Sequence, residues 1–97
     1  MMYTLFNLKE KMCPLCTSCD ISGTETMAGS GLSLDQCKSK CLDDASCRGI
    51  DFGKGWRAGQ CYLNYVNILQ NVDFGSHESF DGYSKNSDCG NLSFYFH

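Results

Sequence analysis

Cysteine is the residue type in this sequence whose number and spacing point most directly to chemistry. Eight cysteines occur among 97 residues, at Cys13, Cys16, Cys19, Cys37, Cys41, Cys47, Cys61 and Cys89. Thiols can form disulfides, ligate metals or act as redox groups, and the cellular compartment decides among these uses. An even number at this density in a short chain is typical of a secreted domain stabilised by disulfides. The sequence therefore predicts an extracellular or secreted protein.

Metal or redox chemistry at the first three cysteines is the alternative interpretation. Metal and iron–sulfur sites of this kind need a fourth ligand, usually close in sequence. The only histidines are His77 and His97, and neither has a partner at zinc-finger spacing. Cys13 and Cys16 have the spacing of a redox pair, but no thioredoxin-like strand–helix pattern surrounds them. We therefore expect structural disulfides, with no metal ligands and no cofactor.

The remaining reactive residue types do not form a recognisable catalytic set. His77 and Glu78 are adjacent, but no nucleophile, second carboxylate or oxyanion-forming motif is recognisable around them. Asp43 and Asp44 do not fit the acidic loop formulas of calcium sites, and they are ordinary polar residues for the end of a helix. The sequence therefore predicts a protein without enzymatic activity.

Charge and hydropathy exclude two classes of partner. The net charge is −3, whereas a nucleic-acid surface needs clustered lysine and arginine. No apolar run approaches the roughly 20 residues of a membrane-spanning helix. Hydrophobic residues make up 42% of the chain, which is enough for one core. We expect a single domain that neither binds nucleic acid nor spans a membrane.

Two further features bear on the secretory pathway. Asn91 begins the sequon Asn91-Leu92-Ser93, which makes it a predicted N-glycosylation site unless a paired strand hides it. The first residues lack a basic leader region, and their apolar stretch is shorter than a signal peptide requires. We expect that a leader has been removed upstream.

Aromatic residues are the candidates for partner binding. Trp56 and Arg57 lie in a glycine-rich segment, and these two residue types dominate binding hot spots when they are exposed. The alternative is that Trp56 folds back and caps the core. Several tyrosines can stack on sugar rings, although such residues more often fill a sheet: Tyr62, Tyr65, Tyr83 and Tyr95. We expect protein partners, with glycans as the alternative ligand.

Residues 1–12 form a predicted apolar arm ahead of the main domain, which spans residues 13–97. A strand at residues 3–8 would present apolar side chains on both sides, among them Tyr3, Leu5 and Phe6. Such a strand can join the edge of its own sheet or of a neighbour's sheet. Both possibilities stay open from the residues alone. Our working hypothesis is a homo-oligomer or filament assembled through this strand.

The clearest signal of local structure is a capping box. Ser33 is followed three residues later by Gln36, the spacing at which the two side chains can cap a helix start. Cys37 and Cys41 then lie one turn apart on a single apolar stripe. We predict a helix over roughly residues 34–44.

Strands are predicted on either side of a glycine-rich turn. Residues 46–52 and 60–66 would form a hairpin with Trp56 near its tip. The alternating or apolar segments 80–84 and 92–96 are further strand candidates. We expect residues 13–19 to be a stapled turn or irregular loop, and residues 22–31 a loop containing at most a short strand.

Two disulfides would fasten the helix to this hairpin. Cys41 can reach Cys47 across a short loop, and Cys37 can reach Cys61 on the second strand. Both helix cysteines would face the sheet, because they are one turn apart.

At this point the sequence resembles the PAN/apple family, over roughly Cys19 to Cys89. The resemblance rests on Leu34-Asp35-Gln36-Cys37-x3-Cys41, Ala45-Ser46-Cys47-Arg48-Gly49-Ile50-Asp51-Phe52, Gly59-Gln60-Cys61-Tyr62-Leu63, and Gly82-Tyr83-Ser84 before Cys89. It implies a small disulfide-rich α+β fold with one helix packed on a curved antiparallel β-sheet. The family's pairing implies Cys37–Cys61 and Cys41–Cys47. It also implies protein–protein or protein–carbohydrate contact.

The same resemblance implies a third bridge between the terminal segments, and three cysteines compete for it. If Cys19 pairs with Cys89, then Cys13 and Cys16 are left; if Cys13 pairs with Cys89, then Cys16 and Cys19 remain. We predict Cys19–Cys89 with Cys13–Cys16. The function we predict is a non-catalytic adhesion or assembly module, a subunit of a larger self-assembled structure, with lectin-like carbohydrate binding as the alternative.

Overall fold

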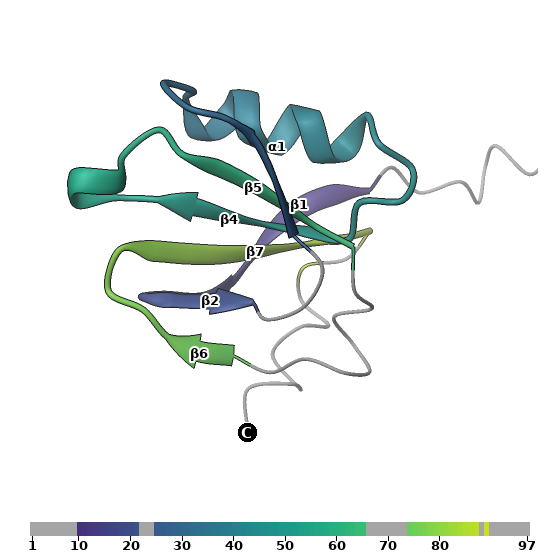
Figure 1. Cartoon of the computed structure of the whole chain (residues 1–97). Helices are drawn as coiled ribbons and strands as arrows, with labels where there is room; N and C mark the ends of the chain where they lie inside the picture. The colour runs from purple at the N-terminus through teal and green to yellow at the C-terminus, as the bar shows by residue number, and fades with distance from the viewer. Residues whose placement is uncertain (1–9, 22–24, 66–73, 88, 90–97) are drawn as a thin grey trace, which may run out of the picture.

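A computed structural model of the chain describes residues 10–21, 25–65, 74–87 and 89. The elements are β1 (Lys11–Cys16), β2 (Cys19–Ile21), β3 (Glu25–Gly29), α1 (Leu34–Leu42), β4 (Gly49–Gly53), the 3-10 turn η2 (Gly55–Arg57), β5 (Cys61–Asn64), β6 (Phe74–Ser76) and β7 (Phe80–Asn86). They form three layers, with α1 on one side of the main sheet and the β2–β6 pair on the other (Figure 1). The protein is thus a small α+β domain with one helix packed on an antiparallel sheet.

The main sheet has five strands in the order β1-β7-β4-β5-β3. All its pairings are antiparallel, and the central strand β4 pairs with β5 through Ile50 and Leu63 and with β7 through Ile50 and Tyr83. A separate two-stranded sheet joins β2 and β6, with Cys19 opposite Ser76. Strands distant in sequence therefore meet side by side at the centre of the sheet.

Helix α1 begins as the capping box predicts. The Gln36 backbone N–H donates to Ser33 Oγ at 3.1 Å, and Gln36 Oε1 accepts from the Ser33 backbone N–H at 2.8 Å. Two otherwise unpaired backbone donors of the first turn are thereby satisfied. The helix ends at Leu42, two residues before the predicted end. Among the described residues, no helix has the length and apolarity that crossing a bilayer requires.

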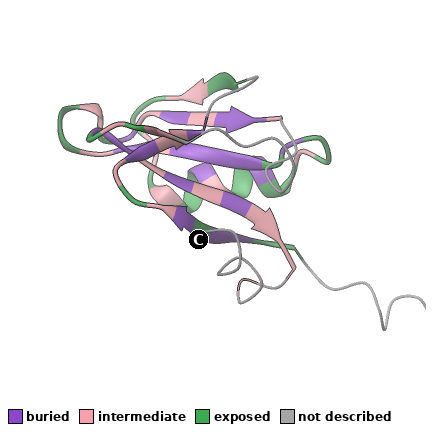
Figure 2. Cartoon of the chain, turned by 90° about the horizontal axis from the view of Figure 1, so that it is seen from below, coloured by how far each residue is buried: buried purple, intermediate pink, exposed green. Residues whose placement is uncertain are grey.

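Side-chain alternation divides the main sheet into two unlike faces. Ile50 and Leu63 face the helix and pack with Met12 and the buried cysteines of α1. The neighbouring residues on the same strands point to the opposite side, because successive strand residues alternate. The buried positions run along the middle of the sheet and the inner side of α1, whereas the outer side of α1 is exposed (Figure 2).

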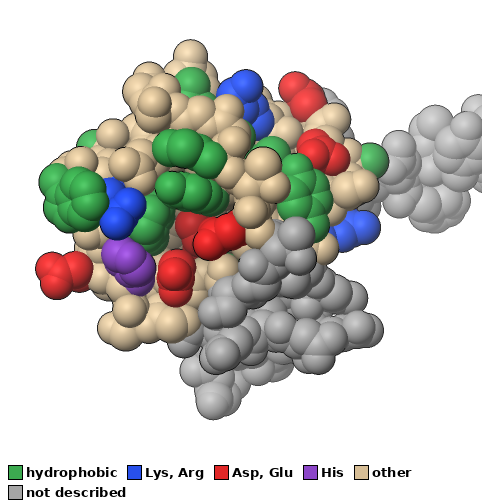
Figure 3. All heavy atoms as spheres, in the orientation of Figure 1, with side chains coloured by type: hydrophobic (Ala, Val, Ile, Leu, Met, Phe, Trp, Pro, Cys, Tyr) green, Lys and Arg blue, Asp and Glu red, His purple; other side chains and the backbone are tan. Residues whose placement is uncertain are grey.

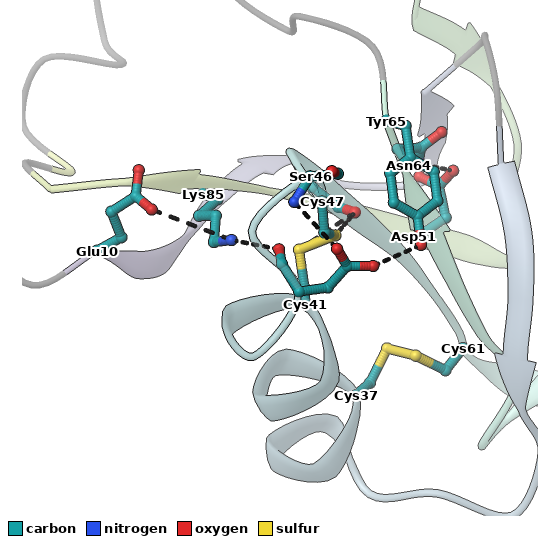
Figure 4. The surroundings of a disulfide bond; sticks show 12 residues. Glu10, Cys37, Cys41, Ser46, Cys47, Asp51, Cys61, Asn64, Tyr65 and Lys85 are labelled. Carbon is teal, nitrogen blue, oxygen red and sulfur yellow. Dashed lines mark hydrogen bonds and ion pairs between the residues drawn. A yellow bond between two sulfur atoms is a disulfide. The ribbon is translucent and has the colours of Figure 1, made fainter.

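The helix carries both of the disulfides that were predicted for it. Cys37 is bonded to Cys61 and Cys41 to Cys47, with Cα–Cα distances of 5.6 Å and 5.3 Å. Figure 4 shows the two bridges on the side of α1 that faces the strands. None of the four cysteines in these two bridges has any exposed surface. These bridges therefore belong to the apolar core as well as closing loops in the chain.

The predicted pairs Cys19–Cys89 and Cys13–Cys16 are wrong. The structure joins Cys13 to Cys89 and Cys16 to Cys19. Cys13 and Cys16 both lie in β1, and three steps along an extended strand separate Cα atoms by about 10 Å, too far for a disulfide. Cys16 and Cys19 instead flank a turn through Ser18, which has φ +53°, so their Cα atoms are 6.0 Å apart.

The region around the first cysteines is also more regular than expected. Residues 13–19 do not form one irregular loop, since β1 runs to Cys16 and β2 begins at Cys19. Lys11 and Met12, at the end of the predicted arm, belong to β1, and Met12 is buried in the core. Residues 1–9 of the arm, with Tyr3, Leu5 and Phe6, lie outside the described residues. So do Asn91 and the predicted strand at 92–96.

Candidate functional site

The turn between β4 and β5 presents the most exposed large apolar side chain among the described residues. Trp56, in the 3-10 turn η2, is 77% exposed, so the alternative in which it caps the core is contradicted. The turn is tight, because a Cβ on Gly53 would lie 2.1 Å from the Arg57 carbonyl oxygen. Gly55 and Gly59 have positive φ angles of +62° and +92°, which favour glycine. The glycine-rich sequence thus builds a compact turn that projects the indole into solvent.

The Arg57 guanidinium packs against the Trp56 indole ring. Its Cζ lies 4.1 Å from the Trp56 ring centroid and 5.3 Å from the Phe80 ring centroid. The Arg57 Nη1 also donates to Gln60 Oε1 at 3.2 Å. Cation–π contacts of this kind favour a defined orientation of both side chains. Trp56 is therefore an exposed but positioned aromatic residue.

A cavity of about 200 Å³ opens beside this turn. Its lining comes from strands and turns that are far apart in the sequence: Asp20, Glu25, Asp51, Arg57, Tyr62, His77 and Phe80. Acidic side chains lie in a hollow of this face, with apolar and basic side chains and a histidine around them (Figure 3). The lining thus combines carboxylates, aromatic rings and one arginine.

Asp51 is the most deeply buried carboxyl group of the cavity, at 1% exposure. Its two oxygens accept from the Ile21 backbone N–H at 3.0 and 3.2 Å, and Oδ2 also accepts from Asn64 Nδ2 at 3.0 Å. Burial raises the pKa of Asp51 to about 7, and the nearby Glu25 also raises it, whereas the hydrogen bonds from Asn64 and Ile21 lower it. Asp51 therefore both anchors β2 to β4 and titrates near neutral pH.

The aromatic part of the lining is held by ring–ring contacts. Tyr62 and Phe80 meet edge to face, with ring centroids 5.7 Å apart, and His77 contacts Phe80 in the same way at 4.9 Å. His77 Nδ1 accepts from the Ser79 backbone N–H at 3.2 Å. Packing of this kind restrains the rings without any hydrogen bond between them. One wall of the cavity is thus a preformed aromatic surface.

An ion pair outside the cavity lining ties the β1–β2 turn to the β4–β5 hairpin. Lys54 Nζ lies 2.8 Å from Asp81 Oδ1 and 2.9 Å from Ser18 Oγ. The Ser18 backbone N–H also donates to Asp81 Oδ1 at 2.8 Å. Burial alone would raise the pKa of Asp81, but the hydrogen bonds from Lys54 and Ser18 lower it below its ordinary value. Lys54 is therefore engaged with Asp81 rather than with the cavity.

The structure brings some of the predicted binding residues together and separates others. Arg57 and Tyr62 line the cavity, and Trp56 stands beside it. Tyr65 and Tyr83 instead pack against the core on the helix side. The Tyr65 hydroxyl donates to Asp44 Oδ2 at 2.8 Å, which lowers the pKa of Asp44. Tyr95 lies outside the described residues.

The three cavity carboxylates were not singled out from the sequence. Asp20, Glu25 and Asp51 come from β2, β3 and β4, so no short motif contains them. One signal was available, since Asp51 is a charged residue inside the otherwise uncharged strand Gly49–Gly53. His77 and Glu78 are adjacent in the sequence, but only His77 lines the cavity. Within the described residues, no group of three or more potential ligands could hold a metal ion.

Comparisons with known proteins identify the family to which this chain belongs. A family model described as the PAN domain matches residues 16–89, which is more than half of the chain. Neither the curated proteins nor the solved structures yielded a match. PAN domains are protein- or carbohydrate-interaction modules, generally extracellular and typically non-catalytic. With the family match spanning the helix, the hairpin and their disulfides, the chain belongs to the PAN domain family.

Proposed function

We propose that this domain is a non-catalytic extracellular adhesion module that binds a protein partner through the β4–β5 turn. The observation that carries the proposal is Trp56, which is 77% exposed yet oriented by Arg57. Tryptophan and arginine are the residue types most enriched in binding hot spots, where a partner removes their surface from water. Because Arg57 already restrains the indole, little side-chain conformational entropy is lost when a partner binds it.

The test compares two exposed apolar side chains. The full chain, Trp56→Ala and Leu42→Ala are immobilised and exposed to medium conditioned by the source cells, and captured proteins are quantified by mass spectrometry. Leu42, at the end of α1, is 38% exposed and lies away from the turn. We expect Trp56→Ala to reduce capture of the partner at least tenfold, and Leu42→Ala to leave it unchanged. Equal capture by all three proteins contradicts the proposal.

We further propose self-assembly through the arm ahead of β1. The support is the apolar composition of residues 1–9 together with the sheet topology, in which β1 and β3 are the outer strands. An edge strand has backbone donors and acceptors that can pair with an added strand. Since Lys11 and Met12 belong to β1, the test deletes residues 1–9 only. Light scattering should show oligomers that the deletion abolishes; an unchanged mass distribution contradicts self-assembly through the arm.

Carbohydrate binding is the second candidate function. It is supported by the aromatic wall of Tyr62 and Phe80 beside the exposed Trp56, because sugar rings stack on such surfaces. A glycan array probed with the full chain and with Trp56→Ala tests it. Selective binding that is lost with Trp56→Ala supports a lectin-like function. No binding, or undiminished binding by the variant, removes this candidate.

A further inference from the structure

The lining of the cavity beside Trp56 contains three carboxyl groups, and none of them belongs to an ion pair among the described residues. The two ion pairs in the described part of the chain are Lys54–Asp81 and Lys85–Glu10, and neither involves a cavity carboxylate. Arg57 also lines the cavity, but its guanidinium is directed to the rings of Trp56 and Phe80 and to Gln60. No ion pair among the described residues therefore links Arg57 to any of the three cavity carboxylates, and its Nε has no hydrogen-bond partner in the described part of the chain.

Asp51 makes this lack of a paired cation costly. A buried carboxylate is stabilised by a cation or by hydrogen bonds, and otherwise it takes up a proton. Asp51 accepts hydrogen bonds from Ile21 and Asn64, and the Glu25 carboxyl group beside it raises its pKa, but it has no cation within ion-pair distance among the described residues. Asn64 is itself fully buried, and its Oδ1 has no partner within the described part of the chain. Within the described residues, this polar network behind the cavity thus contains one buried acceptor without a hydrogen-bond partner.

The geometry of the carboxylates favours one kind of cation. Asp20, Glu25 and Asp51 come from three different strands and line one cavity, although they are not grouped closely enough to hold a metal ion. An ammonium group has three donors arranged around one nitrogen, whereas a guanidinium is planar and prefers one carboxylate in a bidentate contact. A volume of about 200 Å³ corresponds to about six or seven water-sized groups. The four outer heavy atoms of a lysine side chain fit such a space.

The aromatic wall suits the same ligand. Tyr62 and Phe80 offer apolar surface to the methylene groups of a lysine, and ring faces attract its charge. Phe80 already has a cation near its ring, because Arg57 Cζ lies 5.3 Å from its centroid. The wall therefore accepts positive charge in the free protein.

We propose that this cavity binds a lysine side chain of the partner protein, with Asp20, Glu25 and Asp51 receiving the ammonium group and Tyr62 and Phe80 contacting its methylene groups. The inference rests on the proposed function in one respect, since it assumes that the ligand of the Trp56 turn is a protein. It adds the chemistry of the residue that the partner inserts beside that turn.

The experiment uses nitrogen-15-labelled full chain and small-molecule probes. Nα-acetyl-lysine methylamide is titrated into the protein, and amide shifts are followed by NMR. The matched probe carries an additional acetyl group on Nε, which removes the charge and leaves the side chain otherwise similar. We expect saturable shifts at β3, β4 and β5 with the charged probe, at a Kd on the order of 1 mM. Equal binding of the two probes, or no saturable binding, overturns the proposal.

Two variants with the same change in net charge locate the binding. Glu25 is exposed on β3, so Glu25→Gln removes a cavity carboxylate with little risk to folding. Glu78 is exposed and does not line the cavity, so Glu78→Gln is the control. We expect Glu25→Gln to weaken binding of the charged probe at least fivefold and Glu78→Gln to change it less than twofold. The same affinity in both variants contradicts the assignment of the site.

The outcome separates this inference from the proposed function. If Trp56→Ala abolishes partner capture but the charged probe does not bind, the lysine site is overturned and the protein-binding turn stands. If the probe binds and Trp56→Ala has no effect on capture, the turn is overturned and the cation site stands. Glucose serves as a further probe, and saturable glucose binding at the same amides without lysine binding identifies the cavity as a sugar site, which also overturns the proposal.

Discussion

The two faces of the main sheet are made from the same strands but differ in chemistry. On the helix side, Ile50 and Leu63 pack with apolar residues and two disulfides. On the other side, their neighbours Asp51 and Asn64 hydrogen-bond to each other at the back of a cavity. Both pairs are buried, so burial alone does not distinguish the faces. We infer that the helix side of the sheet contributes most of the stability, whereas the other side contains a polar site whose burial costs some of it.

Alternation along β4 and β5 is what permits this division. A strand places successive side chains on opposite sides, so a residue chosen for packing constrains its neighbour only weakly. The helix side adds covalent bonds to apolar burial, which helps the domain to retain a buried carboxyl group on the opposite face. Proteins commonly accept such locally unfavourable groups at binding sites.

The largest expected difference between the faces comes from adjacent residues of β4. Ile50→Ala should lower the free energy of unfolding by about 4 kcal/mol, because it removes buried methyl groups and leaves a cavity in the core. Guanidinium denaturation followed by circular dichroism, under non-oxidising and non-reducing conditions, measures the change. The control is Asp51→Asn at pH 6, which should cost less than Ile50→Ala. The opposite order would contradict the assignment of stability to the helix side.

Disulfides give the next comparison. Replacing Cys37 and Cys61 together by alanine should lower stability by about 3.5 kcal/mol, since this bridge spans 24 residues. The same replacement at Cys16 and Cys19, which are separated by 3 residues, should cost about 2 kcal/mol. Thermal unfolding of both double variants beside the parent protein tests the order. If the short bridge proves the more important, the β2–β6 side contributes more to stability than we infer.

The polar face should make stability depend on pH. The pKa of Asp51 is about 7 in the folded protein and 3.8 in the reference state, so between these values the folded protein binds more protons than the unfolded chain. Stability therefore falls as pH rises from 5 to 8, by roughly 2–3 kcal/mol. Asp44 and Asp81 have lowered pKa values, so their contributions are lost only at more acid pH.

Denaturation midpoints measured from pH 5 to pH 8 test this dependence. Asp51→Asn removes the titrating carboxyl group and should flatten the curve, so the variant gains stability relative to the parent as pH rises. Asp35→Asn, an exposed change of equal charge on α1, is the control and should leave the slope unchanged. A flat curve for the parent protein would show that Asp51 does not carry the pH dependence.

The same division explains what the sequence could predict. The capping box at Ser33 and the cysteine spacing of Cys37 and Cys41 are short-range signals, and they predicted the helix and its two bridges. The pairing of Cys13 with Cys89 depends instead on the pairing of β1 with β7, two strands that most of the chain separates in sequence. Local spacing carries little information about such a pairing, so both Cys13 and Cys19 were candidate partners of Cys89, and the predicted pair with Cys19 was wrong.

The candidate site was predicted only in part for a related reason. Trp56 and Arg57 lie in one glycine-rich turn, for which the sequence left open an exposed tip or a cap on the core, and the structure shows the exposed tip. The three carboxylates line one cavity because of how distant strands are placed. The Ile21 N–H of β2 donates to Asp51 of β4, and β5 pairs with β4 on one side and with β3 on the other. A charged residue at a strand centre, as Asp51 is in β4, was the one local sign of a polar face. Its partners depend on strand order, which periodicity does not determine.

The smallest expected effects are those of removing the helix cap and of removing the Lys54–Asp81 ion pair. Ser33→Ala should lower stability by about 1 kcal/mol, because a first-turn backbone donor loses its acceptor. Lys54→Gln should cost about 0.5 kcal/mol, since the side chains of Lys54 and Asp81 are 37% and 29% exposed and water screens their attraction. Raising the salt concentration should shrink the second difference and leave the first unchanged, because only the second is an ion pair. Denaturation curves at low and high salt for both variants decide the matter. A larger and salt-independent loss with Lys54→Gln would mean that its hydrogen bond to Ser18 is what holds the β1–β2 turn against the hairpin.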